Sequence, residues 1–401
     1  MVSALVVVTL VVASVASLFM AWAIGAGSSG STPFAPAVGA NAISVMRAGF
    51  VVGLLGLLGA VLQGANVSEA VGRSLISGVT LSPLAATIAL LLAAALVAIG
   101  VFTGYPIATA FTVTGAVIGV GLALGGDPAW AKYRQISAVW VLVPFVGGGV
   151  AYATARLLRN ESVPERVAIP FLGGVVGVVL ANIQFTVLGS SGSGASLAQA
   201  VGDRLDFLPG LVGEAAVTLA IAGLFAFLLL RDLDADEIRG QRHFLLTLGA
   251  LVAFSAGGSQ VGLAIGPLLP LLEQFSVTVS LVAVLLFGGF GLLLGSWTGA
   301  PRMIKAIAQD YSSLGPRRSI AALIPSFVIA QVAVFLGVPV SFNEIIVSAV
   351  VGSGYAAGGA GVSKGKMGRT VLAWLASLVG AVVLGYGSYV AVSAGLDALL
   401  G

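Results

Sequence analysis

Long apolar runs, separated by short polar or glycine-rich segments, follow one another along almost the whole chain. A helix that crosses a bilayer needs about 20 apolar residues, because the hydrocarbon core is about 30 Å thick. We therefore predict an all-α, polytopic membrane protein with about ten to twelve transmembrane helices, some of them broken or re-entrant. The apolar runs lie at residues 2–24, 44–63, 81–101, 136–155, 166–190, 210–230, 244–256, 277–296, 318–336 and 370–393.

Composition indicates the same class of protein. Hydrophobic residues make up 58% of the 401 residues and charged residues only 8%, with a mean hydropathy of +1.11. So few charges cannot cover the surface of a soluble protein of this length. The lipid bilayer is therefore the expected surrounding, and a multi-pass position in the cell membrane the expected location. The net charge of +3 is too small to indicate a nucleic-acid partner.

Reactive side chains are scarce. The chain has no cysteine, and its single histidine, His243, lies in a charged connecting segment. Without these residues the usual metal-binding and hydrolytic constellations cannot be assembled. The chain also lacks a nucleotide-binding motif of the GxxxxGK[ST] type. We therefore expect no enzyme activity, no resident metal and no cofactor.

Positive charge is concentrated in two connectors. Residues 156–166 and 231–243 together hold six arginines, whereas residues 191–209 hold only Arg204. Two predicted crossings separate the arginine-rich connectors, so we expect both on the same face, which the positive-inside rule makes cytoplasmic. Most of the tryptophan side chains are expected near the membrane–water interfaces, as an aromatic belt. The tryptophans are Trp22, Trp130, Trp140, Trp297 and Trp374.

Two short patterns recur in the same order near the two ends of the chain. From proline to proline they are 70 residues apart in the first copy and 72 in the second. Broken apolar segments at corresponding places in two halves indicate a transporter with its substrate site at mid-membrane. We divide the chain into a first repeat (1–155), connecting helices and charged loops (156–243) and a second repeat (244–401). The segments are AGSSGSTPFAP (26–36) and GYPIATAFTVTGAVIGVG (104–121), then GGSQVGLAIGP (257–267) and GVPVSFNEIIVSAVVGSG (337–354).

Prolines and small residues give these segments unusual chemistry for a membrane. Pro36, Pro106, Pro267 and Pro339 are predicted to break helices, because proline lacks a backbone donor. A broken helix presents free N–H groups and the positive end of its dipole, which suit an oxyanion. Such backbone is tolerated at membrane depth only facing a cavity or packed protein. The alternative is that glycine and serine merely allow close helix packing, but four paired segments favour a site.

At these residues the chain resembles the inorganic phosphate transporter (PiT) family of sodium- or proton-coupled anion symporters. That family carries, in each half, a GANDVANAxxP-type motif followed by GxPVSTTHxxxG. The corresponding segments are residues 28–36 and 104–115, then 259–267 and 337–348. The resemblance covers nearly the whole chain. It implies two inverted repeats that hold an anion where the four segments meet, and it implies a homodimer.

The chain departs from the family pattern at the acidic positions. Ser28 and Ser29 in the first copy, and Ser259 and Gln260 in the second, stand where the family has Asn-Asp. Both family carboxylates are therefore missing, and neutral oxygens hold Na⁺ more weakly, so sodium coupling cannot simply be carried over. The serine-rich first motif is closer to the branch of the superfamily that includes bacterial sulfate permeases.

A set of polar motif residues is predicted to bind the anion or its companion ion. Hydroxyl and amide groups can bind an oxyanion without a full positive charge, which leaves the ion free to depart. The residues are Ser28, Ser29, Thr32, Thr109, Ser259, Gln260, Ser341 and Asn343.

Glu344 is the predicted coupling residue. It falls where the family motif has histidine, and the matching position of the first copy is Phe111. A charged side chain at the centre of a membrane helix costs about 2.5–3.5 kcal/mol, and burial favours the protonated form of a carboxylate. We therefore hypothesise that Glu344 couples anion uptake to a proton or cation. The alternatives are a water-exposed end of the half-helix or an ion pair with an arginine.

Together these patterns predict a secondary active transporter of an inorganic oxyanion, with phosphate as the first choice and sulfate as the alternative. We expect Na⁺- or H⁺-coupled symport with alternating access. An anion entering against an inside-negative potential is opposed by about 2.3 kcal/mol per charge per 100 mV, so accumulation requires a co-transported cation. A passive anion channel is a further alternative, and a channel would not accumulate the anion.

Overall fold

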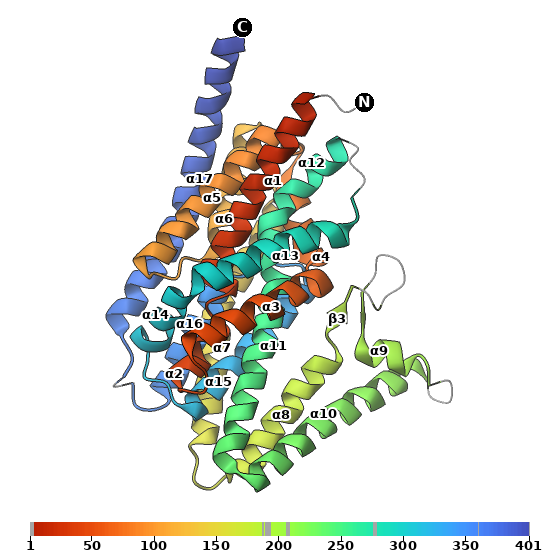
Figure 1. The fold of residues 1–401 in the computed structure, drawn as a ribbon, viewed down its shortest axis with the longest axis vertical. Coiled ribbons are helices and arrows are strands. Elements are labelled where there is room, and N and C mark those ends of the chain that lie inside the picture. The colour runs from red at the N-terminus through yellow and green to blue at the C-terminus, as the bar shows by residue number, and fades with distance from the viewer. Residues whose placement is uncertain are drawn as a thin grey trace.

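The structure of the chain, a computed structural model, is almost entirely helical (Figure 1). It describes residues 4–186, 188, 194–205, 209–275, 279–359 and 361–400. Within these residues nine helices are long and apolar enough to cross a membrane. The predicted all-α polytopic fold is confirmed.

The helices form two series joined by a hairpin that leans away from them (Figure 1). The first series is α1 (Ala4–Ile24), the π-helix η1 (Gly25–Ser29), α2 (Ala35–Gly39), α3 (Val45–Gln63), α4 (Ala65–Arg73), α5 (Pro83–Thr103), α6 (Thr109–Ala123) and α7 (Trp130–Leu158). The hairpin region holds α8 (Glu165–Ala181), α9 (Leu197–Gly202) and α10 (Gly210–Ala235). The second series is α11 (Glu237–Ile265), the 3₁₀ turn η2 (Gly266–Leu268), α12 (Leu269–Gln274), α13 (Leu281–Thr298), α14 (Ala300–Asp310), α15 (Pro316–Phe335), α16 (Phe342–Tyr355) and α17 (Lys364–Leu400).

Short strands occur only at connections within the described residues. Strand β1 (Ile76–Ser77) pairs antiparallel with β2 (Asp127–Pro128), and β3 (Gln184–Phe185) pairs antiparallel with β4 (Ala195–Ser196). These two-residue pairs pin the ends of neighbouring helices and add no sheet layer.

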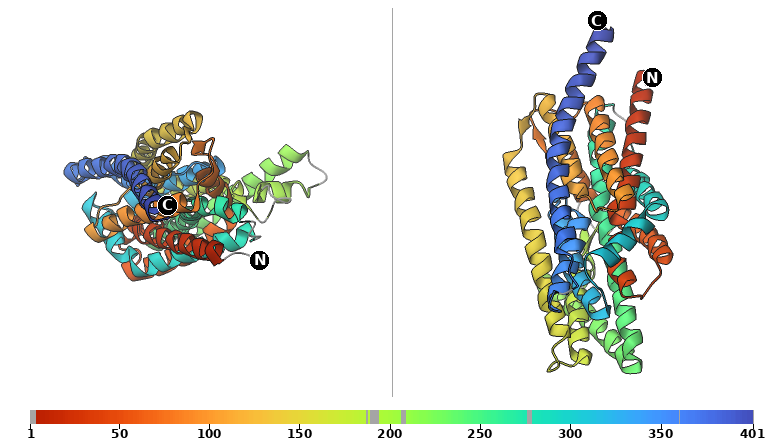
Figure 2. Two further views of the ribbon diagram at one scale, coloured as in Figure 1. Left: turned by 90° about the horizontal axis from the view of Figure 1, so that it is seen from above. Right: turned by 90° about the vertical axis from the view of Figure 1, so that its left-hand side faces the viewer.

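The two series run in opposite directions through the molecule. The described start of α1 and the end of α17 lie at one end, and α11 starts at the other end, where α10 finishes (Figures 1 and 2). Each series has the same order of elements: a long helix, a short segment, a second helix, a short helix, another long helix, a break, a half-helix and a long final helix. This order agrees with a duplication, and the boundaries of the repeats stay a prediction.

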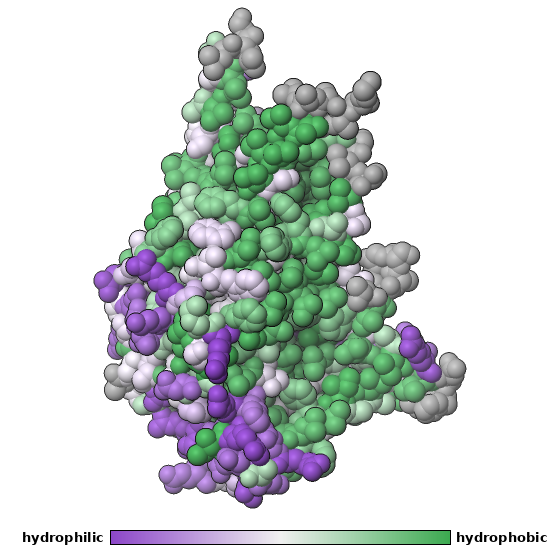
Figure 3. Space-filling view, in the orientation of Figure 1, coloured by the Kyte–Doolittle hydropathy of each residue, from purple (hydrophilic) through white to green (hydrophobic). Residues whose placement is uncertain are grey.

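The two arginine-rich connectors lie together. Arg166 Nη1 is 3.4 Å from Asp234 Oδ1, and Gln241 donates a hydrogen bond to Glu165. Figure 3 shows hydrophilic residues gathered over this end of the visible face and hydrophobic residues over most of the remainder. Both connectors therefore share one face, as predicted, and its assignment to the cytoplasm stays a prediction from the positive-inside rule.

Two of the predicted apolar runs differ from the observed helices. Helix α8 ends at Ala181, earlier than the run 166–190, and residues 187, 189 and 190 of that run lie outside the described residues. The run 244–256 is only the middle of α11, which starts in the charged connector and continues into the second small-residue segment. Helix length was underestimated there because the flanking residues are not apolar.

The small-residue segment of the second copy is regular helix, contrary to the expectation of broken backbone. Helix α11 continues to Ile265, and the chain leaves it only at the 3₁₀ turn that contains Pro267. A Cβ atom on Gly257 would lie 1.9 Å from the carbonyl oxygen of Gly56 in α3, so glycine serves close helix packing here. At Gly257 the small residue therefore serves packing, as the alternative held.

The matching segment of the first copy does break. Helix α1 passes into η1, and residues 30–34 follow as turns before α2. A Cβ atom on Gly25 would lie 2.1 Å from the carbonyl oxygen of Leu292 in α13, which fixes glycine at the start of η1. π-Helical turns are uncommon and occur frequently at functional sites.

Two further interruptions separate the half-helices from the long helices before them. Residues 104–108, the first break, lie between α5 and α6, and residues 336–341, the second break, lie between α15 and α16. Gly104 (φ 74°) and Gly337 (φ 58°) adopt the left-handed conformation that favours glycine. The proline two residues after each glycine keeps the chain from returning to helix at once.

Helix packing at Gly59 gives a test of this fold. A Cβ atom there would lie 1.8 Å from the carbonyl oxygen of Phe254, across the contact between α3 and α11. We expect Gly59→Ala to force the helices apart and to lower stability by about 1–3 kcal/mol, measured by thermal unfolding of the purified protein in detergent. Gly56→Ala is the matched control on the same helix, because its Cβ would meet nothing within 4 Å. Equal melting temperatures for the two variants would contradict this packing.

Candidate functional site

A buried cluster of polar groups joins the two series, with Gln260 of α11 at its centre. Its Oε1 accepts hydrogen bonds from Ser28 Oγ (3.1 Å) and Thr109 Oγ1 (2.8 Å). Its Nε2 donates to the carbonyl oxygen of Val340 in the second break. One amide side chain therefore ties η1, the start of α6 and the second break together.

Asn343 makes a second bridge between the two copies. Its Nδ2 donates to the carbonyl oxygens of Gly27 (2.9 Å) and Ile107 (2.6 Å), which belong to η1 and the first break. Ser28, Gln260 and Asn343 have no exposed surface. The cluster is thus closed to both faces of the protein.

Two half-helices start beside the cluster. Helix α6 begins at Thr109 and α16 at Phe342, and their first backbone hydrogen bonds come from the N–H groups of Thr112 and Ile345. The N–H groups before these donors have no acceptor inside their helices. Together with the positive ends of the helix dipoles, they can receive an oxyanion.

Several buried oxygen atoms of this region have no hydrogen-bond partner among the described residues. They are Ser259 Oγ, Ser341 Oγ, Asn343 Oδ1 and Glu344 Oε2. An unpaired buried polar atom costs about 1–3 kcal/mol, so native proteins rarely keep several near one another. Their role as ligands of an ion stays a prediction.

Glu344 lies in the first turn of α16 and is 1% exposed. The ion pairs of the described residues do not include it. Neither alternative from the sequence, a water-exposed end or an arginine partner, fits this position. The matching residue of the first copy, Phe111, stacks on Trp140 with ring centroids 4.0 Å apart. The carboxylate is therefore present in one copy only.

Ser29 and Thr32 are less directly placed than the other predicted ligands. Ser29 is buried within η1. Thr32 Oγ1 donates to the carbonyl oxygen of Ser28 at 3.1 Å, so its hydroxyl hydrogen is used within its own turn. Both lie near the cluster in sequence, and their roles as ligands stay predictions.

The four predicted helix-breaking prolines fall into two groups. Pro106 and Pro339 lie inside the first and second breaks. Pro267 lies in the turn that follows α11, whereas Pro36 lies at the start of α2. Proline is tolerated at a helix start because its missing donor has no acceptor there, so Pro36 interrupts no helix.

Two tryptophans hold the breaks, a role that the sequence did not suggest. Trp140 Nε1 in α7 donates to the carbonyl oxygen of Pro339 at 2.9 Å, and Trp374 Nε1 in α17 donates to that of Pro106 at 2.7 Å. Both rings are buried inside the protein, so these two are not part of the expected aromatic belt. The sequence contains one sign of this role. Trp140 follows Pro106 by 34 residues, and Trp374 follows Pro339 by 35 residues.

The donor set of the cluster suits a small cation as well as an anion. Within the described residues no three His, Asp or Glu side chains gather to hold a metal ion. The unpaired hydroxyl, amide and carboxylate oxygens are the kind of ligand that hard cations prefer.

Comparisons with known proteins agree with these observations. The model of the phosphate transporter family matches residues 24–385. A candidate phosphate permease of Pyrococcus furiosus is 26% identical, over 91% of this chain and 92% of its own length. The chloroplastic inorganic phosphate transporter 2-1 of Arabidopsis thaliana is 25% identical, over 91% of this chain and 69% of its own length. The solved structure of a sodium-dependent phosphate transporter shares the fold, with a TM-score of 0.80 and 24% identity over 96% of this chain and 99% of that chain.

Gln260→Leu tests the central cluster. The change removes the acceptor of two hydroxyls and the donor to Val340, so buried polar groups lose their partners at a cost of about 1–3 kcal/mol each. We expect a clearly lower melting temperature for the purified variant in detergent. Gln309→Leu, at an exposed position of α14, is the control and should melt like the unaltered protein. An unchanged melting temperature for Gln260→Leu would contradict these hydrogen bonds.

Proposed function

Since the chain belongs to the phosphate transporter family, we propose that it moves inorganic phosphate by Na⁺- or H⁺-coupled symport, with alternating access between two inverted halves. The buried cluster around Gln260 carries the proposal. It combines hydroxyl and amide groups, the N-termini of two half-helices and a single carboxylate, supplied by both series. The homodimer stays a prediction.

Neutral donors would hold the anion in this cluster. Hydrogen bonds to an ionised acceptor are roughly twice as strong as those between neutral groups, and exclusion of water strengthens them further. No lysine or arginine of the described residues is buried. The anion can therefore leave without separating a buried ion pair, a step that costs several kcal/mol.

Glu344 would link anion binding to a cation. An ionised carboxylate repels an anion by about 4 kcal/mol at a separation of 4 Å and an effective dielectric constant near 20. A proton on Glu344, or Na⁺ held by its oxygens and neighbouring hydroxyls, removes that repulsion. Anion and cation then bind more favourably together than separately, which is the requirement for symport.

Alternating access would break the contacts that join the two series. The bonds from Thr109 to Gln260 and from Asn343 to Ile107 both cross between copies. While both are present, the site is closed to both faces. If the bond from Thr109 to Gln260 broke while the bond from Asn343 to Ile107 stayed, or the reverse, the site would open to one face at a time.

Sulfate is the second candidate because of the serine pair Ser28–Ser29 in the first motif. The unpaired Oε2 of Glu344 favours phosphate, since a hydrogen phosphate ion carries an O–H group that can donate to a carboxylate oxygen. Sulfate carries no proton near neutral pH, so it could not donate such a hydrogen bond and would be repelled by the ionised carboxylate.

Uptake into proteoliposomes tests the proposed substrate. We expect the purified protein to accumulate radiolabelled phosphate when an inward Na⁺ or proton gradient is imposed, and unlabelled phosphate to compete better than sulfate. Stronger competition by sulfate would assign the chain to sulfate transport. Equilibration of phosphate without accumulation under any cation gradient would indicate a channel.

Glu344→Gln tests the coupling. The amide keeps the size of the side chain but neither carries a proton nor offers a charge to Na⁺, so gradient-driven accumulation should be lost while phosphate exchange continues. Both rates can be measured in the same proteoliposomes. Glu69→Gln, at an exposed position of α4, is the matched control and should keep the response to the gradient. If Glu344→Gln kept its full gradient response, Glu344 would have no part in coupling.

A further inference from the structure

Each break is contacted by a lysine from the final long helix of the opposite series. Lys132 Nζ in α7 donates to the carbonyl oxygen of Gly337, at 3.4 Å, in the second break. Lys366 Nζ in α17 lies over the ring of Tyr105 in the first break, 4.3 Å from its centroid. In both helices the lysine precedes the break-binding tryptophan by eight residues. Helices α7 and α17 start toward opposite ends of the protein (Figure 2), and each lysine lies in the first turn of its helix.

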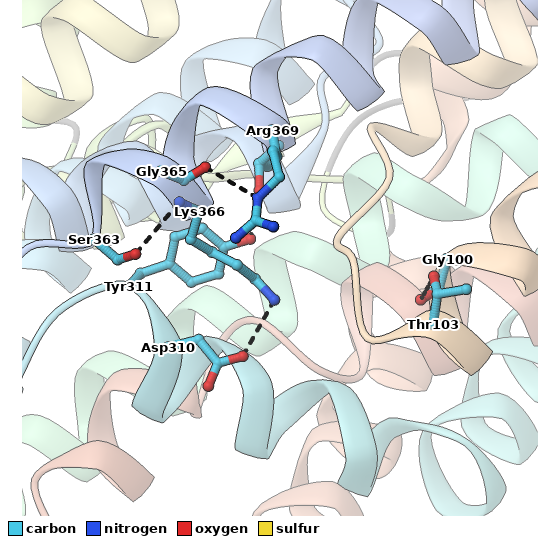
Figure 4. A network of polar contacts seen from close by, with 9 residues as sticks. Gly100, Thr103, Asp310, Tyr311, Ser363, Gly365, Lys366 and Arg369 are labelled. Carbon is cyan, nitrogen blue, oxygen red and sulfur yellow. Dashed lines mark hydrogen bonds and ion pairs between the residues drawn. The ribbon is translucent and has the colours of Figure 1, made fainter.

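Lys366 has a carboxylate partner. Its Nζ is 3.2 Å from Asp310 Oδ2, and its side chain is 16% exposed (Figure 4). Tyr311 lies beside the pair, with its ring centroid 5.9 Å from the ammonium. Burial raises the pKa of the Tyr311 hydroxyl, which shares a hydrogen bond with Thr370, so Tyr311 stays neutral. Asp310 therefore balances the charge of Lys366 at the cytoplasmic end.

Lys132 contacts only neutral acceptors among the described residues. Its Nζ donates to Gln135 Oε1 (3.2 Å) and to the carbonyl oxygen of Gly337. No carboxylate of the described residues lies within ion-pair distance of it. An ammonium group has three donors, so one donor and an unbalanced charge remain available to an anion.

The second break connects Lys132 directly with the central cluster. Gly337, beside Lys132, is at one end of this segment, and Val340 and Ser341 are at the other. Val340 accepts the Gln260 hydrogen bond, and the Ser341 hydroxyl has no partner among the described residues. An anion held at Lys132 is thus one short extended segment away from the proposed binding site.

We propose that Lys132 forms a second, peripheral oxyanion site, which captures phosphate at the face opposite the arginine-rich connectors before it enters the cluster. The inference rests on the proposed phosphate transport. An unbalanced positive charge beside the segment that leads to the cluster raises the local concentration of an anionic substrate. The equivalent lysine at the opposite end, Lys366, is paired with Asp310, so its own charge is balanced. The two lysines therefore differ in the charge that each can offer to an anion.

The kinetics of Lys132→Gln test the proposal in right-side-out membrane vesicles that contain the protein. We expect the KM for external phosphate to rise about fivefold, while the maximal rate stays within about twofold of that of the unaltered protein. A fivefold change corresponds to about 1 kcal/mol, the size of a charge contact that water partly screens. The rise should shrink at high ionic strength, because salt screens the lysine of the unaltered protein. Lys132→Arg should keep a KM near that of the unaltered protein.

Arg134→Gln is the matched control, because it removes one positive charge from the same exposed turn of α7 without touching the second break. Its KM should not change, and a rise equal to that of Lys132→Gln would overturn the proposal in favour of general surface charge. An unchanged KM for Lys132→Gln would also overturn it. If the unaltered vesicles failed to take up phosphate at all, the proposed function itself would fail instead.

Asp310→Asn tests the other half of the argument. The change leaves the Lys366 ammonium without its carboxylate, so the half-saturating internal phosphate concentration for efflux should fall about fivefold. External KM should not change. An unchanged half-saturating concentration for efflux would contradict the role of Asp310 in balancing the charge of Lys366.

Discussion

Every backbone donor and acceptor inside a bilayer must find a partner within the protein, and the whole arrangement depends on this constraint. The two breaks leave carbonyl groups at membrane depth that no helix can satisfy. Trp140 and Trp374, each from the opposite series, donate to the proline carbonyls, and amide side chains of Gln260 and Asn343 donate deeper in the breaks. The interrupted backbone is therefore stable only when the two series are packed together.

The same composition of small residues serves two different purposes in the two copies. In the first copy, close approach of α13 at Gly25 accompanies the π-helix η1 and an irregular turn. In the second copy, Gly257 lets α3 pack against an intact α11, from which Gln260 projects into the cluster. One side of the cluster is thus a rigid helix and the other an irregular backbone, so the two copies contribute unequal parts to one site.

The two copies also differ in the buried charge that they contribute. Glu344 is the one buried charged side chain among the described residues, and it belongs to the second copy. In the proposed transport, an anion near Glu344 would be repelled by an ionised carboxylate and would bind better together with a proton or a cation. Both ions would then act through the same few atoms of the second copy.

Sequence alone determined the helical membrane class, the paired motifs and the polar residues that meet in the cluster. Run length and recurring Gly-x-Pro patterns are local features, so they can be read without a fold. Tertiary structure decided that residues 257–265 stay helical, that Glu344 has no ion-pair partner among the described residues, and that Trp140 and Trp374 satisfy the breaks. The bonds of these tryptophans join residues 199 and 268 positions apart. Such contacts depend on how distant helices pack, and the chemistry of a single segment does not specify that packing.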